Sequence, residues 1–144
     1  MARGDSVQFG KEGVLQVDAR KNAIILPNGL PMFYHGLAAE RGDRGYEYTY
    51  RTRKGPNRIY GGKVVENVCQ AVARCIIGHQ MILLAKRYKA VLTVHDSIIT
   101  CVPDEELVEA QAYMEECMSQ TPDWAKGLPI TCESGTGKSY GECE

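Results

Sequence analysis

The sequence His95-Asp96-Ser97 sets one carboxylate between two runs of residues that favour extended structure. The first run ends at Val94 and the second begins at Ile98, and both are rich in the β-branched residues that fit a pleated, half-buried surface. Short polar side chains tolerate the dihedral angles of a turn, so this segment predicts a β-hairpin with Asp96 at its tip. A carboxylate in that position is either a turn former or a metal ligand, and the pattern alone favours the turn.

A helical pattern from about Lys63 to Tyr88 precedes the hairpin and carries further groups that could bind a ligand. At 100° per residue its apolar side chains fall on one side of the helix. The opposite side holds a narrow polar stripe of Lys63, Asn67, Gln70 and Arg74. The stripe stops after Arg74, so only the first half of the helix has groups able to read a ligand. His79 lies on the apolar side and is interpreted as a core histidine rather than a base or ligand.

The rest of the chain predicts a mixed α+β fold. Two short strands, Asn22–Leu26 and Pro31–Gly36, are joined across the turn sequence Pro27-Asn28-Gly29. A second helix is expected over about 104–120, with acidic residues in its first turn, where the helix dipole favours negative charge. A last strand is expected at Ile130–Glu133. We therefore expect an antiparallel sheet with the His-Asp hairpin packed against two main helices, at about 63–88 and 104–120. Residues 1–20 are expected to form a disordered or helical lead-in to a domain over 21–144.

The segment Tyr46–Lys54 alternates in the manner of a strand. Tyr46, Tyr48, Tyr50 and Thr52 share one face of it. Exposed tyrosines at this spacing could stack on the bases of a single strand, but an aromatic stripe is more often a core face. We therefore expect these tyrosines to be buried.

Composition sets the broad class of the protein. A chain of 144 residues with 44% hydrophobic residues is long enough for one compact domain. No apolar run approaches the roughly 20 residues of a membrane span, and the first residues lack the apolar core of a signal peptide. We expect no membrane association and a cytoplasmic location. The six cysteines contain no close CxxC pair, so neither a zinc site nor a disulfide framework is indicated.

The formal net charge of −1 hides a division along the chain. Residues 41–89 contain eleven Lys and Arg against three acids, whereas residues 90–144 contain eleven Asp and Glu against two Lys. A basic surface of this kind could bind a polyanion, because each neutralised phosphate releases counterions. Solvated faces of opposite sign explain the division equally well.

Three segments together resemble the C-terminal part of the palm of family A, polymerase-I-like DNA polymerases, and especially their phage members. They are YGGKVVENVCQAVAR at 60–74, VLTVHDSI at 91–98 and ITCESGTGKSYGE at 130–142. The segment AIILPNGLPMFY at 23–34 is similar to the strand pair that precedes this region in the phage enzymes. The resemblance covers the chain from about residue 20 onward.

The resemblance implies roles at matching positions. Asp96 corresponds to a carboxylate that helps to hold two Mg²⁺ ions in template-directed nucleotidyl transfer. His95 matches a residue that contacts the primer terminus, and Gln70 matches a glutamine that donates to the minor groove. Lys63, Asn67 and Arg74 could likewise donate to minor-groove acceptors and phosphates. Such contacts do not depend on the base sequence. Primer–template DNA and deoxynucleoside triphosphates are the implied partners.

The chain departs from the family pattern at two points. The family usually has an acidic residue after His-Asp, where this chain has Ser97. The family's other catalytic aspartate, in a D-Y-S-like strand, and its nucleotide-binding fingers helix have no counterpart in the 144 residues. A two-metal site would then need its second carboxylate from outside this chain.

Three readings follow from the sequence. In the first, the chain is a C-terminal palm fragment or split subunit of a DNA-directed DNA polymerase, inactive alone and joined by an N-terminal segment or subunit. In the second, it is a non-enzymatic α+β nucleic-acid-binding module that uses the Tyr46–Lys54 strand and the polar stripe. In the third, it is a metal hydrolase that uses His95 and Asp96, for which further ligands are not evident. We expect the first, with an exposed sheet edge or apolar patch where the missing part docks.

Overall fold

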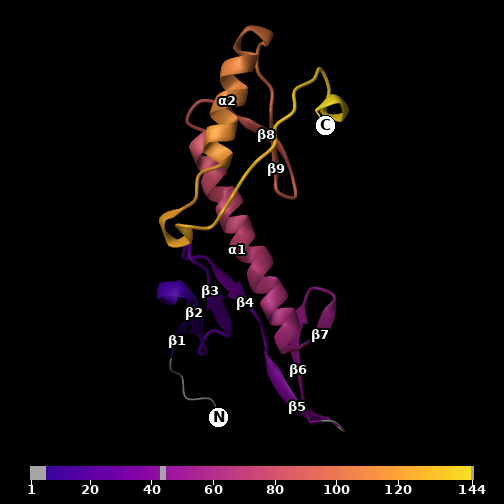
Figure 1. Cartoon of the computed structure of the whole chain (residues 1–144). Coiled ribbons are helices and arrows are strands. Elements are labelled where there is room, and N and C mark those ends of the chain that lie inside the picture. Colours follow the sequence, from indigo (N-terminus) through magenta and orange to yellow (C-terminus); the bar gives the residue numbers. More distant parts are fainter. Residues whose placement is uncertain (1–5, 43–44, 144) are drawn as a thin grey trace. The chain divides into compact units, whose positions relative to one another are not determined.

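The computed structural model describes residues 6–42 and 45–143, and the order of its elements can be followed in Figure 1. The chain divides into two compact units, one ending at Ala73 and the other beginning at Arg74. Helix α1 (Gly61–Leu84) contributes its first half to the first unit and its second half to the second. The expected α+β class with antiparallel sheets and two main helices is confirmed. No helix among the described residues is long and apolar enough to cross a membrane.

The first unit contains two antiparallel sheets. Strands β1 (Val7–Phe9), β2 (Leu15–Asp18), β3 (Ala23–Ile25) and β4 (Pro31–Phe33) form one sheet in chain order. Strands β5 (Ala38–Gly42), β6 (Gly45–Thr52) and β7 (Gly55–Ile59) form the other, also in chain order.

The predicted hairpin across Pro27-Asn28-Gly29 is confirmed as β3 and β4. The backbone N–H of Leu26 donates to the carbonyl of Leu30 at 2.9 Å. The side-chain oxygen of Asn28 accepts from the N–H of Leu30 at 3.1 Å. Gly29 has φ 83°, a left-handed value that explains the glycine at this position.

Two strands occupy most of the segment for which a disordered or helical lead-in was expected. β1 pairs with β2, and a short 3-10 turn at Lys11–Gly13 joins them. Leu15 is 8% exposed and belongs to the core of the first unit. These strands are too short for their alternation to stand out from the surrounding glycines and charged residues. Residues 1–5 lie outside the described residues.

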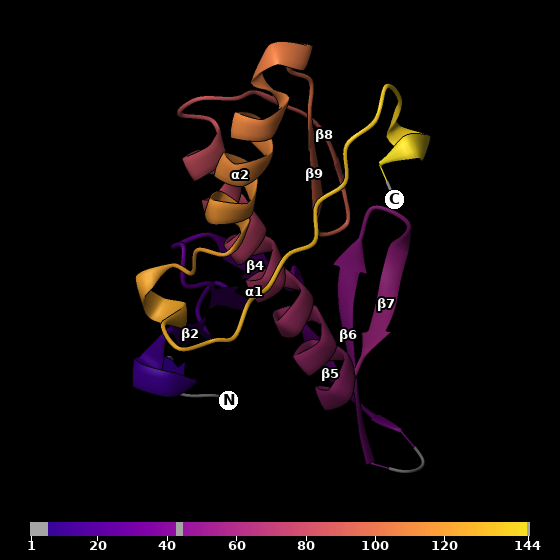
Figure 2. The ribbon, with the colours of Figure 1, turned by 45° about the horizontal axis from the view of Figure 1, so that its top comes forward.

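The core of the first unit joins both sheets to the first half of α1. Its buried members are Leu15, Ile24, Tyr34 and Ile59. Val64, Val68 and Val72 of α1 pack against this cluster, as the apolar pattern of the helix predicts, but Val65, another apolar residue of this half, is 62% exposed. Figure 2 shows β6 and β7 beside the first turns of α1, where Ile59 leads into the helix.

The expectation of a buried tyrosine face on β6 is wrong for two of the three tyrosines. Tyr50 packs against the core, but Tyr46 is 69% exposed and Tyr48 is 46% exposed. The cause is the length of the strand. β6 has eight residues, and the core of the first unit reaches Tyr50 and Ile59, the partner of Tyr48, but stops short of Tyr46.

The second unit packs the predicted hairpin against two helices. Strands β8 (Ala90–Val94) and β9 (Ser97–Thr100) form a two-stranded sheet. Buried Ile98 of β9 clusters with Leu84 of α1 and Cys117 of α2 (Leu107–Met118). Both helices are shorter than predicted, because α1 ends in turns at 85–88 and a 3-10 turn, Asp104–Glu106, precedes α2.

The strand expected at Ile130–Glu133 is absent from the described part of the chain. This segment lacks a neighbouring strand to complete a ladder. Side chains hold the tail instead. Gln111 of α2 donates its amide to the hydroxyl of Ser134 at 2.7 Å, and Lys138 forms an ion pair with Asp104.

Candidate metal and nucleic-acid site

The turn between β8 and β9 consists of His95 and Asp96. Val94 and Ser97 are direct partners in the ladder, so only these two residues connect the strands. His95 has φ 53°, a left-handed conformation in which histidine is uncommon. Unusual backbone geometry is concentrated at functional sites. The sequence drew attention to Asp96, and the structure adds the strained backbone of the residue before it.

Asp96 presents a free carboxylate. Its side chain is exposed, as are those of His95 and Ser97. Within residues 6–42 and 45–143, the Asp96 carboxylate accepts no hydrogen bond and forms no ion pair. A carboxylate without an internal partner retains all its lone pairs for an external ligand.

The described residues contain no group of three or more His, Cys, Asp and Glu that could hold a metal ion. Mg²⁺ is commonly held by one or two carboxylates, with waters and substrate phosphates as the remaining ligands. The exposed Asp96 carboxylate therefore suits one ligand position of a Mg²⁺ site and cannot make the site alone. The hydrolase reading, which needs further ligands from this chain, gains no support among the described residues.

Glu66 links two members of the polar stripe on α1. The Lys63 ammonium lies 2.7 Å from Oε1 of Glu66, and the amide of Gln70 donates to the same oxygen at 3.4 Å. The hydrogen bond with Glu66 raises the pKa of Lys63 above its usual value. Sequence reasoning missed Glu66, although its spacing of three and four residues from these partners is the one at which helix side chains meet.

Asn67 lies on the same stripe but points into the first unit. Its side-chain amide donates to the hydroxyl of Tyr34 at 3.2 Å. Tyr34 is 7% exposed and packs edge-on against Tyr50, with ring centroids 5.3 Å apart. Asn67 therefore satisfies a buried hydroxyl, and one of its two donor hydrogens is occupied.

The site residues fall into two groups. Lys63, Asn67 and Gln70 belong to the first unit, whereas His95 and Asp96 belong to the second. Arg74 is exposed at the first residue of the second unit. Within each group the structure brings side chains together, Lys63 with Gln70 through Glu66, and His95 with Asp96 through the turn.

The second half of α1 contains a buried polar residue that sequence reasoning missed. Gln80 is 1% exposed, and its amide donates to the carbonyls of Met118 at 2.6 Å and Gln120 at 3.2 Å. The positions of Ile76, Gln80 and Leu84 repeat every four residues, which could have revealed Gln80 on the apolar face. His79, predicted to be in the core, is half-buried and lines a surface cleft with Leu83, Tyr113 and Cys117.

Comparison with known proteins gives one informative relationship. No family model and no solved structure matches the chain. A protein of Bacillus phage SP02 named DNA polymerase is 38% identical over an alignment of length 118, and the match covers 75% of this chain and 18% of the phage protein. The chain thus spans about a fifth of the length of that relative. It is related in sequence to a phage DNA polymerase.

Proposed function

We propose that the chain is the C-terminal palm portion of a family A type DNA polymerase, either as a split subunit or as a fragment of a longer enzyme. The relationship to the phage DNA polymerase is the observation that carries this proposal. The free carboxylate of Asp96, on a turn fixed by the Val94 and Ser97 pair, supports it. The activity is nucleotidyl transfer by the assembled enzyme, and the isolated chain is inactive.

Asp96 is the metal-binding residue of the proposal. Its exposed carboxylate would be one ligand of a two-Mg²⁺ site, and the second carboxylate would come from outside this chain. When bound, the ions stabilise the negative charge that develops on the transferred phosphoryl group and the attacking hydroxyl. His95 would contact the primer terminus. Ser97 supplies a hydroxyl where a further carboxylate would strengthen the attraction for a cation.

The polar stripe is the DNA-contacting part of the proposal. Lys63, Gln70 and Arg74 can donate to minor-groove acceptors and phosphates without selecting a sequence. Glu66 holds Lys63 and Gln70 in position but also neutralises part of the positive charge. Asn67 would use its remaining donor hydrogen.

The missing part of the enzyme needs a place to dock, and we assign it to the β8 side of the hairpin. β8 pairs only with β9 among the described residues, so its other edge has unpaired backbone groups. Val91 and Leu92 of β8 are each 50% exposed. A strand of the missing part would pair with this edge and cover these side chains.

A chimera tests the proposed function. The segment of the phage SP02 polymerase that aligns with this chain is replaced by the corresponding residues of this chain, and primer extension is measured. We expect extension that falls at least about 100-fold with Asp96→Asn, because loss of a metal ligand removes several kcal/mol of transition-state stabilisation. Asp123→Asn, at another exposed aspartate of the second unit, is the matched control. A folded chimera without extension, or one indifferent to Asp96→Asn, would contradict the proposal.

The alternative function, a non-enzymatic nucleic-acid-binding module, is favoured by one observation, the exposure of Tyr46 and Tyr48. It predicts tight binding of nucleic acid by the isolated chain and no extension by the folded chimera. The two functions therefore differ in the response of the chimera.

A further inference from the structure

Two tyrosines on the sheet of β5, β6 and β7 do not belong to the core of the first unit. Tyr46 is 69% exposed and Tyr48 is 46% exposed, so a large part of each residue remains in contact with water. They lie two residues apart on one strand, so their Cα atoms are about 7 Å apart and both side chains leave the same face. Burying two such rings against a ligand would remove a large aromatic surface from water.

The register of the sheet identifies the other residues on this tyrosine face. Arg41 is the direct partner of Tyr46, and Ala39 is the direct partner of Tyr48. Paired side chains share a face, so Arg41 leaves the sheet on the same face as Tyr46. Ile59, the direct partner of Tyr48, and Tyr50 belong to the core of the first unit. The tyrosine face therefore begins at the border of this core and continues outward from it.

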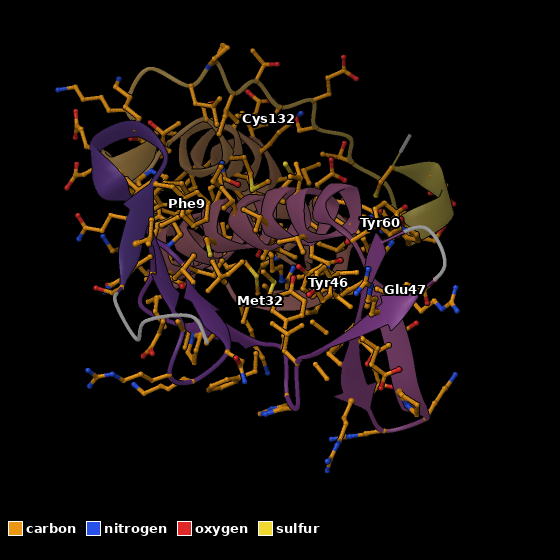
Figure 3. All side chains as sticks on the ribbon, turned by 90° about the horizontal axis from the view of Figure 1, so that it is seen from below. Phe9, Met32, Tyr46, Glu47, Tyr60 and Cys132 are labelled. Carbon is orange, nitrogen blue, oxygen red and sulfur yellow. The ribbon has the colours of Figure 1, made fainter. Side chains whose placement is uncertain are left out.

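Charge is distributed unequally between the two faces of this sheet. Both acidic residues within the three strands, Glu40 and Glu47, are paired with each other and thus occupy the face opposite the tyrosines. Glu47 also forms an ion pair with Arg58 at 2.9 Å. Tyr46 and Glu47, labelled in Figure 3, lie on opposite sides of β6. Among the described residues of the strands, the tyrosine face has Arg41 as its charged group and carries no acid.

Positive charge lies on the β5 side of the tyrosine face, where Arg41 pairs with Tyr46. Arg53 and Lys54 occupy the turn between β6 and β7, beyond Tyr50 and the core, and are not part of this face. A spacing of about 7 Å between Tyr46 and Tyr48 matches about two stacked bases, which rise about 3.4 Å each.

We propose that the tyrosine face of the β5–β6–β7 sheet binds single-stranded DNA. Bases stack on Tyr46 and Tyr48, and the phosphates meet Arg41. Exposed aromatic rings on a sheet, beside a cation, are the arrangement with which proteins hold unpaired bases. Duplex DNA is a poorer ligand because its bases are already stacked on one another.

The choice of DNA as ligand rests on the proposed function, since the relative is named a DNA polymerase. The site itself is separate from it. Tyr46, Tyr48 and Arg41 all belong to the first unit and require neither Asp96 nor a second chain. Binding of an oligonucleotide by the isolated chain therefore tests this site, whereas primer extension by the chimera tests the proposed function.

The experiment measures the affinity of the whole chain for a fluorescent 12-residue oligothymidylate, by anisotropy at several salt concentrations. We expect Tyr46→Ala and Tyr48→Ala each to weaken binding by at least about 5-fold, the lower end of what one stacked base contributes. Tyr46→Phe, which keeps the ring, should stay within about 2-fold of the wild type. Tyr140→Ala is the matched control, because Tyr140 is 56% exposed in the second unit. Thermal unfolding verifies that every variant is folded.

Several results would overturn the inference. The inference would be wrong if the wild-type chain failed to bind the oligonucleotide. It would also be wrong if the chain bound the equivalent abasic oligomer equally well, because phosphate contacts alone would then explain the binding. Unchanged affinity of the Tyr46→Ala and Tyr48→Ala variants would be a third contradicting result. A fourth contradicting result would be that these substitutions abolish extension by the chimera but leave oligonucleotide binding intact. That result would identify the face as a protein interface.

Discussion

Val94 and Ser97 face each other as the last pair of the β8–β9 ladder, and this pairing leaves His95 and Asp96 to make the whole turn. The exposed carboxylate at the tip and the left-handed backbone of His95 are two consequences of the same short connection. Ile98, two residues later, anchors the hairpin in the core with Leu84 of α1 and Cys117 of α2, whereas Asp96 lies in the turn beyond the strands and is exposed.

The φ of 53° at His95 predicts how substitutions there affect stability. Asparagine tolerates the left-handed region, whereas a β-branched residue does not. We expect His95→Asn to change the free energy of unfolding by no more than about 0.5 kcal/mol and His95→Val to lower it by about 1–2 kcal/mol. Urea unfolding measures both. Equal stability of the two variants would show that the turn relaxes freely.

The bond between Lys63 and Glu66 makes two predictions about charge. Because the pKa of Lys63 is raised in the folded chain, its ion pair is fully present below the pKa of the unfolded chain and is lost as pH rises through the folded pKa. NMR titration of the Lys63 ammonium should show this upward shift, and Glu66→Gln should abolish it. An unchanged titration in Glu66→Gln would mean that another group sets the pKa.

The same substitution should strengthen DNA binding. Glu66→Gln removes one negative charge from the polar stripe and releases Lys63. We expect a rise of about 2- to 10-fold in the affinity for primer–template, with a steeper dependence on salt because one more phosphate is neutralised. Glu109→Gln, which breaks an ion pair with Arg87 in the second unit, is the control. Equal gains in both variants would indicate an effect of net charge alone.

Gln80 is a buried polar residue of the second unit, where a charge would be costly. Gln80→Leu loses two donors to backbone carbonyls, and we expect a loss of about 1–2 kcal/mol in the free energy of unfolding. Gln80→Glu places a carboxylate in the same buried position. Burial would raise the pKa of that carboxylate. The free energy of unfolding of the variant should therefore be lower at pH 7 than at pH 4, where the carboxyl group is protonated. Gln120→Glu, at an exposed residue, should show little dependence of this kind.

The open edge of β8 predicts self-association of the isolated chain. Leu92 is 50% exposed on a strand that pairs on one side among the described residues. A charge on an edge strand discourages edge pairing, so Leu92→Lys should increase the monomer fraction in sedimentation velocity. Val108→Lys, at an 82% exposed position on α2, is the control and should leave the distribution unchanged. A wild-type chain that is monomeric at high concentration would contradict the docking edge.

Local patterns in the sequence predicted the elements that are marked by turn residues or by a clear hydrophobic periodicity. The hairpins at Asn28-Gly29 and His95-Asp96 follow from turn residues between β-branched runs, and α1 follows from its valine periodicity. Patterns of exposure were less predictable. Whether Tyr46 is buried depends on how far the core of the first unit extends beneath β6, which alternation along one strand does not encode.

Partners distant in the sequence explain the remaining differences. The bond between Asn67 and Tyr34 joins positions 33 residues apart, and Gln80 meets carbonyls 38 and 40 residues away. Such contacts arise only when the elements are assembled. The roles of Asp96, His95 and Gln70 come from the resemblance to family A polymerases, and they stay predictions until activity is measured.

The most direct test is the rate of single-nucleotide incorporation by the chimera that carries this chain, measured across a range of Mg²⁺ concentrations. If Asp96 is a metal ligand, Asp96→Asn will lower the maximal rate by at least about 100-fold, and the residual activity will require more Mg²⁺. Asp123→Asn will behave as the unsubstituted chimera. An Asp96→Asn chimera with an unchanged rate and an unchanged Mg²⁺ dependence would contradict the assignment of Asp96 to the active site.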